Sequence, residues 1–254
     1  MPSNHSAVGS VRASLAQRLL SLVDLTSLNA SDDEATIRKL SGLADTAAGR
    51  VAAVCTWRRL VPVARAALQG RGIAVAAVAN FPAGAADIEA AAAETAAAIA
   101  AGADEVDVVF PYREFLAGHA DTGLQLVRAC RAACGDRALL KVILETGQIA
   151  APERIRRAAG IAIEGGAQFL KTSTGKTEPG ATVEAATVLL EAIGDAANRG
   201  LQIGFKASGG IRSIEQAQSY LQLYENRFGA ESAKPENFRI GASALIHELL
   251  AQLQ

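Results

Sequence analysis

Cysteine and histidine are scarce in this sequence, and each shortage argues against a class of protein. The chain has three cysteines among 254 residues, at Cys55, Cys130 and Cys134. An odd, small number does not build a disulfide framework, so we expect a reducing compartment and a cytoplasmic location. The three histidines lie far apart, at His5, His119 and His247. Because no set of these residues has the spacing of metal ligands, the sequence argues against a metal-dependent lyase.

The sequence also lacks an excess of charge and long apolar runs. Its formal net charge is −1, which gives no electrostatic reason to expect nucleic acid or an anionic membrane as partner. No apolar run approaches the roughly 18 residues of a membrane span. A site for an anionic ligand must therefore be local.

Apolar segments rich in valine and isoleucine alternate with alanine-rich helical stretches along the chain. We expect eight strands, at Val23–Leu25, Val51–Cys55, Ile73–Ala79, Glu105–Phe110, Leu139–Leu144, Gln168–Thr172, Gln202–Lys206 and Phe238–Ile240. Their continuous hydrophobicity is typical of parallel strands covered on both faces, and each interval has the length of one βα unit. The sequence therefore predicts an α/β protein with a single (β/α)8 TIM barrel.

The N-terminal segment predicts one addition to this barrel. Apolar residues recur at helical spacing between Val11 and Val23, which indicates an extra amphipathic helix at one end of the fold. We expect a flexible N-terminal arm over residues 1–10 and one barrel domain over residues 11–254.

Charged residues occur within five of the expected apolar strands, where βα loops begin and barrel chemistry is found. They are Asp24, Asp107, Lys141, Lys171 and Lys206. A buried charge is costly unless it is paired or functional, and one alone would fit a structural ion pair equally well. Five that point into one barrel favour an active site. We interpret Asp104 and Glu105 as solvated or bottom-face groups.

Two of these lysines suggest amine chemistry. A lysine nucleophile must be neutral, although the unperturbed pKa of its amine is about 10.4. Desolvation and a second ammonium from Lys206 can bring the pKa of Lys171 towards about 7–8. Asp107 can then bridge the two lysines and relay protons.

Glycine-rich segments follow the last three expected strands, at residues 171–176, 204–212 and 241–243. Glycines that expose N–H groups just before a helix form an anion nest, and the loops after strands seven and eight are the common phosphate site of barrels. A P-loop is not supported, because Leu170 stands where it needs a glycine.

These motifs closely resemble the class I deoxyribose-phosphate aldolases of the bacterial type, from about Val23 to Leu250. The segments that carry the resemblance are Asp24–Thr26, Asn80–Pro82, Gly102–Asp107, Lys171–Lys176 and Lys206–Gly210. The resemblance implies reversible cleavage of 2-deoxy-D-ribose 5-phosphate to acetaldehyde and D-glyceraldehyde 3-phosphate, in deoxyribonucleotide catabolism. It implies no cofactor and no metal, and a homodimer as the assembly.

The resemblance also assigns roles to residues. It makes Lys171 the Schiff-base lysine, Lys206 the second lysine that lowers its pKa, and Asp107 the proton-relay acid. It places the phosphate on Gly175, Lys176, Gly209, Gly210, Arg212, Gly241 and Ser243. Further residues expected to bind substrate are Asp24, Asn29, Cys55, Lys141 and Thr174.

The C-terminal part of the sequence departs from this family at two points. Position 244 is Ala244 where some members have a second serine, and the chain stops at Gln254 without the C-terminal tyrosine of some members. The first removes one expected phosphate contact, and the second leaves the turnover rate open. A barrel that binds sugar phosphates without converting them would fit the glycine loops, but not the lysine pair with Asp107.

Overall fold

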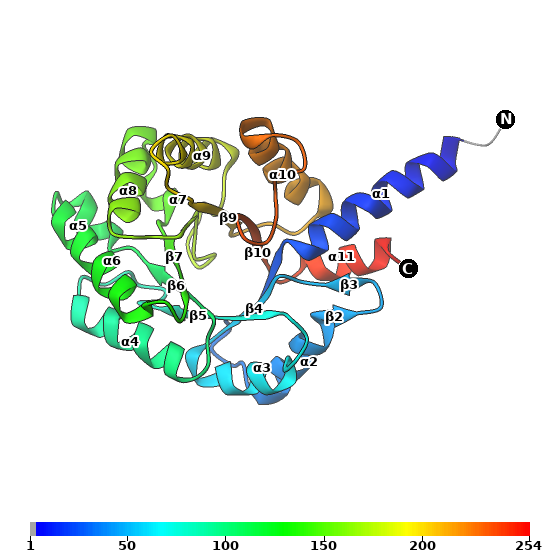
Figure 1. Cartoon of the computed structure of the whole chain (residues 1–254), viewed down its shortest axis with the longest axis horizontal. Helices are drawn as coiled ribbons and strands as arrows, with labels where there is room; N and C mark the ends of the chain where they lie inside the picture. Colours follow the sequence, from blue (N-terminus) through cyan, green and yellow to red (C-terminus); the bar gives the residue numbers. More distant parts are fainter. Residues whose placement is uncertain (1–3) are drawn as a thin grey trace.

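The computed structural model describes residues 4–254, with side chains from Arg12 onward. Eight parallel strands close into a barrel in the order β1-β10-β9-β8-β7-β6-β5-β4 (Figure 1). They are β1 (Val23–Thr26), β4 (Ala53–Thr56), β5 (Ala74–Ala79), β6 (Glu105–Val109), β7 (Leu139–Ile143), β8 (Phe169–Lys171), β9 (Gly204–Ser208) and β10 (Phe238–Ala242). Every predicted strand overlaps an observed one, so the TIM barrel is confirmed.

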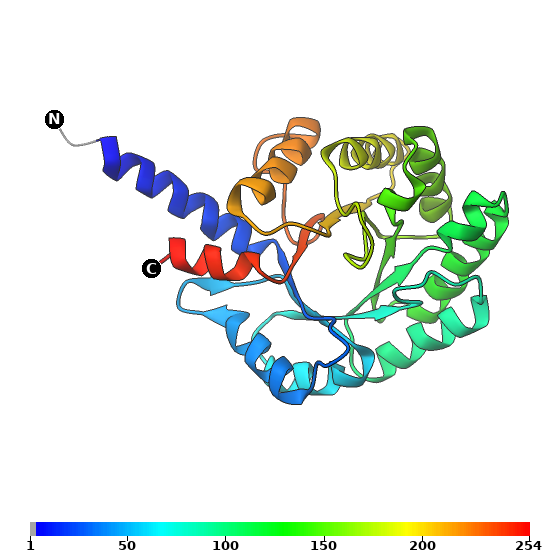
Figure 2. The same ribbon diagram turned by 180° about the vertical axis from the view of Figure 1, so that it is seen from behind.

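Helices surround the barrel on its outer face, as the two opposite views show (Figures 1 and 2). They are α1 (Asn4–Ser21), α2 (Glu34–Leu43), α3 (Val61–Ala67), α4 (Ile88–Ala100), α5 (Tyr112–Leu116), α6 (Ala120–Cys134), α7 (Thr146–Ile149), α8 (Pro152–Glu164), α9 (Val183–Ala197), α10 (Ile214–Phe228) and α11 (Leu245–Gln252). One 3-10 turn, η1 (Arg58–Leu60), precedes α3.

Polar caps fix where several of these helices begin, and so they fix the lengths of the loops above the barrel. Asp87 caps α4 by accepting a hydrogen bond from the N–H of Ala90 at 2.9 Å. Thr182 caps α9 in the same way. Ser213 and Gln216 form a reciprocal capping box at the start of α10, directly after the loop that follows β9.

A short antiparallel hairpin lies outside the barrel and is absent from the sequence-based expectations. Its strands are β2 (Asp45–Thr46) and β3 (Gly49–Arg50). Asp45 receives hydrogen bonds from Arg50 at 3.0 Å and Arg71 at 2.8 Å. Two-residue strands carry no hydrophobic period, so the pattern that revealed the barrel strands could not reveal these.

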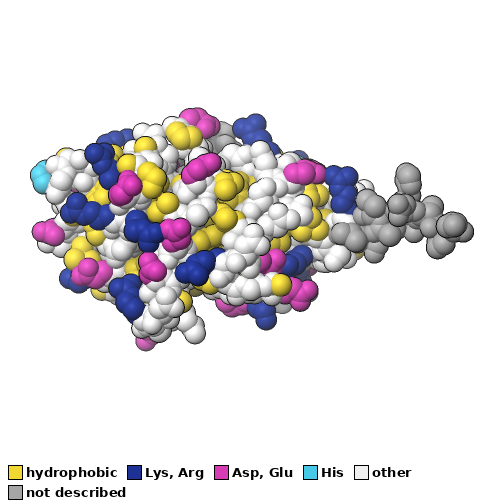
Figure 3. All heavy atoms as spheres, turned by 90° about the horizontal axis from the view of Figure 1, so that it is seen from above, with side chains coloured by type: hydrophobic (Ala, Val, Ile, Leu, Met, Phe, Trp, Pro, Cys, Tyr) yellow, Lys and Arg dark blue, Asp and Glu magenta, His cyan; other side chains and the backbone are white. Residues whose placement is uncertain are grey.

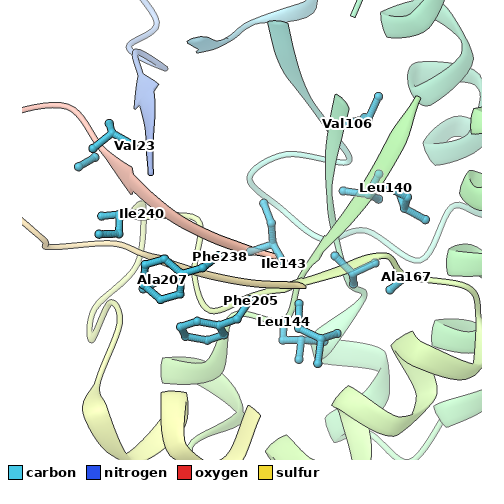
Figure 4. Close-up of a cluster of buried hydrophobic side chains, with 14 of the residues drawn as sticks. Val23, Val106, Leu140, Ile143, Leu144, Ala167, Phe205, Ala207, Phe238 and Ile240 are labelled. Atoms are coloured by element: carbon cyan, nitrogen blue, oxygen red, sulfur yellow. The ribbon is translucent and has the colours of Figure 1, made fainter. Parts of the chain in front are cut away.

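Alternate residues of the barrel strands face opposite sides of the sheet. Phe205 and Ala207 on β9 and Phe238 on β10 belong to the apolar layer between the barrel and its helices (Figure 4). The residues next to them, Lys206 and Arg239, are also buried but pair with carboxylates inside the barrel. The outward apolar packing therefore turns these charges inward.

An aromatic ring closes the floor of the barrel interior. Phe169 precedes Lys171 by two residues and therefore lies on the same, interior face of β8. The guanidinium carbon of Arg239 lies 5.8 Å from the centroid of the Phe169 ring. Gly204 on β9 makes room for the ring, because a Cβ at this position would lie 2.4 Å from a ring carbon. The ring of Phe169 therefore lies beneath the charged side chains of the barrel interior.

The N-terminal helix is present, and it starts earlier than expected. α1 lies beside α11 and extends beyond it (Figures 1 and 2). Arg12 and Arg18 pair with Glu215 and Glu225 of α10. The helix begins at Asn4, within the segment 1–10 predicted as a flexible arm. Residues 1–3 of that segment lie outside the described residues, and its flexibility stays a prediction.

Acidic and basic side chains are interspersed over the face of the molecule drawn in Figure 3. This mixture agrees with the formal net charge of −1. In the described part of the chain, no helix has both the length and the apolar character needed to cross a bilayer.

The barrel floor gives a prediction for stability. Gly204→Ala places a methyl group against the ring of Phe169, and we expect it to lower the free energy of unfolding by about 1–3 kcal/mol because of overpacking. Gly160→Ala is the matched control, since a Cβ at this exposed position of α8 meets nothing within 4 Å. It should raise the free energy of unfolding by roughly 0.5–1 kcal/mol. Denaturant unfolding measures both, and equal stabilities would contradict the close contact.

Candidate active site

A cavity of about 220 Å³ opens at the carboxyl ends of the barrel strands, among the loops after β1, β8, β9 and β10. The predicted site residues that line it are Asn29, Lys171, Thr174, Gly175, Lys176, Gly209, Gly210, Arg212, Gly241 and Ser243. Those that are buried without lining it are Asp24, Cys55, Asp107, Lys141 and Lys206. The wall also contains residues that the sequence analysis did not name as substrate-binding: Thr26, Ser27, Leu28, Ser208, Ile211 and Ala242. Ala244, noted from the sequence for its missing hydroxyl, lines the wall as well.

Asp107 is the point where the lysines of the interior meet. The ammonium groups of Lys171 and Lys206 donate to the same carboxylate oxygen, Asp107 Oδ2, at 2.8 and 2.7 Å. Lys141 Nζ donates to the other oxygen, Oδ1, at 2.9 Å. Lys171 is 3% exposed and the other three are fully buried. The expected bridge between Lys171 and Lys206 through Asp107 is therefore present in the geometry.

A second layer of charges lies nearer the barrel floor. Arg239 donates to Asp24 Oδ1 at 2.6 Å and to Glu105 Oε1 at 2.7 Å. Lys141 donates to Glu105, and Lys206 donates to Asp24. Glu105 was expected to be a solvated or bottom-face group; it lies near the barrel floor but is not solvated, because its side chain is enclosed inside the barrel and the residue is 4% exposed. Asp104 does lie at the surface, where it pairs with Arg65.

Arg239 is a site-region residue that the sequence reasoning missed. It stands in the middle of an apolar strand, Phe238-Arg239-Ile240, as Lys171 and Lys206 do in theirs. The rule that selected the other interior charges would therefore have found it.

The pKa values of the three lysines differ because their surroundings differ. Burial lowers the pKa of Lys171, and the ammonium of Lys206 lowers it further against the opposing effect of Asp107. Burial also disfavours the charged form of Lys206, but the carboxylates of Asp107 and Asp24 outweigh it and raise its pKa. The same balance raises the pKa of Lys141. Lys171 thus combines the lowered pKa with access to the cavity.

The carboxylate at the centre stays ionised in this setting. Burial alone would raise the pKa of Asp107, but Lys141, Lys171 and Lys206 together hold it well below its usual range. An ionised Asp107 can accept a proton from a hydroxyl or return one, directly or through water.

The loops after β8 and β9 use glycine where the backbone demands it. Gly175, Gly209 and Gly210 have φ values of +74°, +96° and +83°, a region that other residues rarely adopt. A Cβ at Gly209 would also lie 3.1 Å from the Cα of Gly180. Because glycine has no side chain, a ligand can approach the backbone N–H groups of these loops closely, which suits an anion.

Cations and helix starts surround the same region. Arg212 and Ser243 lie just before the N-termini of α10 and α11 and line the cavity. Lys176 Nζ donates to the carbonyl oxygen of Leu28 at 2.8 Å and so joins the loop after β8 to the loop after β1. Positive helix ends and exposed cations make this side of the cavity suitable for a phosphate group.

Glu145 is a further residue that sequence reasoning missed. It follows β7 with φ +56° and is fully buried. Its carboxylate accepts hydrogen bonds from the N–H of Thr174 at 3.2 Å and from Thr174 Oγ1 at 2.6 Å. Thr174 Oγ1 in turn accepts from the N–H of Lys176 at 3.0 Å. A buried acid thus holds the loop that carries Gly175 and Lys176 in place.

Comparison with known proteins shows the family to which the chain belongs. A model of the family described as DeoC/LacD family aldolase matches residues 18–245. The match spans the whole barrel and all of its interior charges. The chain belongs to the DeoC/LacD family of aldolases. It is therefore an aldolase, a carbon–carbon lyase.

Solved structures agree with the barrel of this aldolase. A protein from Coccidioides immitis, assigned as a deoxyribose-phosphate aldolase, is 28% identical over 96% of this chain and 95% of its own, with a TM-score of 0.79. A protein from Toxoplasma gondii ME49 with the same assignment is 25% identical over 96% and 97%, with a TM-score of 0.87. The deoxyribose phosphate aldolase from Aeropyrum pernix, described as a tetramer, shares the fold at 24% identity over 98% of each chain, with a TM-score of 0.76.

The acidic side chains of the site do not form a metal centre in the described part of the chain. Among the side chains that the structure describes, from Arg12 to Gln254, no group of three or more His, Cys, Asp or Glu is arranged to hold a metal ion. The interior carboxylates are instead engaged by lysine and arginine.

The Glu145 contact gives a prediction for anion binding. Glu145→Gln replaces one carboxylate oxygen by an amide NH2, so one of the two donors of Thr174 loses its acceptor. We expect the looser loop to weaken the affinity for inorganic phosphate by roughly five- to tenfold, the loss of about one hydrogen bond. Glu153→Gln, the same change at an exposed position of α8, is the control and should bind phosphate as wild type does. Isothermal titration measures both, and equal affinities would refute the positioning role of Glu145.

Proposed function

We propose that this aldolase reversibly cleaves 2-deoxy-D-ribose 5-phosphate to acetaldehyde and D-glyceraldehyde 3-phosphate, through a Schiff base on Lys171 and without a metal ion. One observation carries the proposal: Lys171 lines the cavity while its amine shares Asp107 Oδ2 with Lys206. The positive side of the cavity and the motif resemblance support a phosphorylated sugar as substrate.

The first step is the capture of the sugar. Neutral Lys171 Nζ adds to C1 of the open-chain aldehyde, and the carbinolamine loses water to give an iminium ion. Desolvation of Lys171 and the nearby ammonium of Lys206 keep the attacking amine in its neutral form. Lys206 itself stays protonated between two carboxylates.

The second step is the cleavage of the C2–C3 bond. Asp107, through water, accepts the proton of the C3 hydroxyl as the bond breaks, and the electron pair moves into the iminium to form an enamine. D-Glyceraldehyde 3-phosphate leaves, C2 of the enamine is protonated, and hydrolysis returns acetaldehyde and free Lys171. Asp107 suits the relay because its carboxylate is ionised and hydrogen-bonded to Lys171.

The phosphate end of the substrate would bind between the loops after β8, β9 and β10. Lys176 and Arg212 supply positive charge there, and Gly209 and Gly210 supply backbone donors in a left-handed conformation. This arrangement would hold C1 towards Lys171 and fix the direction of the sugar in the cavity.

Trapping with borohydride tests the Schiff base. With acetaldehyde, borohydride should reduce the imine and leave an ethyl group on Lys171, which peptide mass spectrometry locates. Because the pKa of Lys171 is lowered, the trapping rate should rise with pH and reach its plateau below the ordinary lysine value of about 10.4. Lys171→Met removes the amine and keeps an unbranched side chain, so it should give no adduct at this position.

The same protein serves for the substrate assay. Wild type should release acetaldehyde from 2-deoxy-D-ribose 5-phosphate at a rate that a chelator does not change, and Lys171→Met should release none. Loss of activity on chelation would instead indicate a metal-dependent lyase. Tight binding of the sugar phosphate without aldehyde release would indicate the non-catalytic alternative.

Replacing Asp107 separates the two chemical steps. Asp107→Asn removes the proton acceptor, and we expect the cleavage rate to fall by about 10²–10⁴-fold. Imine formation with acetaldehyde needs only a neutral Lys171, so borohydride should still label Lys171 in this variant. Far-ultraviolet circular dichroism checks the fold. Equal losses of labelling and cleavage in a folded variant would argue against a proton-relay role for Asp107.

A further inference from the structure

The barrel interior holds one continuous cluster of charged residues, each at most 5% exposed. Its members are three carboxylates and four cationic groups: Asp24, Glu105, Asp107, Lys141, Lys171, Lys206 and Arg239. With every group ionised, the cluster has one positive charge in excess. With one base neutral, its charges cancel.

We infer that the balance between the charges of Glu105 and Arg239, neither of which lines the cavity, maintains the protonation state of Lys171, so that loss of either charge alone would shift it. The inference rests on the proposed function, in which Lys171 must be neutral to attack the aldehyde. Glu105 and Arg239 are then positioning residues that act on the nucleophile through the interior charges.

The cost of an unbalanced interior is the physical basis of this coupling. Buried charges are stable only when opposite charges compensate them. Lys206 contacts two carboxylates, Asp107 and Asp24, and Lys141 contacts Asp107 and Glu105. Lys171 contacts Asp107, at an oxygen that it shares with Lys206. Lys171 is therefore the base that releases its proton most readily.

An unbroken chain of charge contacts connects the floor to the nucleophile. Arg239 binds Asp24, Asp24 binds Lys206, Lys206 binds Asp107, and Asp107 binds Lys171. A parallel route runs from Arg239 through Glu105 and Lys141 to Asp107. A change of charge at Glu105 or Arg239 thus reaches Lys171 without leaving the enclosed interior.

The other titratable groups around Lys171 do not change the charge balance of the cluster. The Cys55 thiol is buried beside the cluster, and burial together with the Asp107 carboxylate raises its pKa, so it stays neutral. On the cavity side, Lys176 and Arg212 are exposed, where solvent and salt screen their charges. The charges that bear on Lys171 at short range are therefore those of the cluster.

Single substitutions at Glu105 and Arg239 should shift the pKa of Lys171 in opposite directions. Arg239→Gln removes one positive charge, so a protonated Lys171 would balance the cluster, and the pH midpoint for trapping should rise by about one unit or more. Glu105→Gln removes one negative charge and should lower that midpoint by a similar amount. A merely structural role of either residue predicts no such opposition of sign.

The double variant Glu105→Gln/Arg239→Gln distinguishes an effect of net charge from an effect of losing either side chain. It restores the charge balance, so its midpoint should return to within about 0.3 units of wild type, although both ionic side chains are gone. Removal of both partners of a buried ion pair is tolerated far better than removal of one, because no uncompensated charge remains. Arg239→Lys keeps the charge and should also retain the wild-type midpoint.

The measurement is the rate of borohydride trapping of acetaldehyde on Lys171 between pH 5 and 10, with thermal unfolding as the check on folding. Opposite shifts in the single variants and recovery in the double variant would establish the inference. Single variants without a shift, or a double variant shifted by one unit, would overturn it. If one single variant does not fold, the other single variant and the double variant decide: a shift in the single variant that the double variant reverses supports the charge balance, and a single variant without a shift refutes it.

Failure of the proposed function would look different. In that case wild type itself would give no adduct on Lys171, at any pH. Failure of the inference leaves the wild-type adduct in place and alters only the pattern of midpoints among the variants.

Discussion

The convergence of three lysine side chains on Asp107 is the constraint on which the rest of the site depends. Lys171 and Lys206 bind one oxygen of this carboxylate and Lys141 binds the other. The contacts require β6, β7, β8 and β9 to keep the register that places Asp107 beside Lys141 and Lys171 beside Lys206. The apolar layer between strands and helices maintains this register. The barrel thus holds these four side chains at contact distance from one another, away from water.

Much of the fold and of this constraint could be predicted from the sequence. The eight barrel strands are continuous apolar runs, and Lys171, Lys206 and Asp107 interrupt such runs with charges that burial penalises. Both signals are local and strong. The glycine-rich loops that line the cavity were also visible, because glycines such as Gly209 and Gly210, which have positive φ in the structure, are concentrated after strands.

The parts that could not be predicted depend on distant contacts or on weak local signals. The hairpin of β2 and β3 has two-residue strands without a period. Glu105 begins its strand as a solvated group would, and only the closed barrel shows that Arg239 and Lys141 lie opposite it. Glu145 contacts Thr174 from the neighbouring βα unit. The sequence also could not tell that burial is the largest influence on the pKa of Lys171, ahead of Lys206.

When Lys171 is neutral, as the proposed mechanism requires, the charges of the barrel interior cancel. The exposed cations of the cavity would then have a second role. An iminium ion on Lys171 would carry a permanent positive charge into a cluster that has no spare carboxylate. A dianion held by Lys176, Arg212 and the starts of α10 and α11 would offset that charge from the open side. Recognition of the phosphate and tolerance of the covalent intermediate would then be one electrostatic property. An uncharged sugar of the same shape would gain neither.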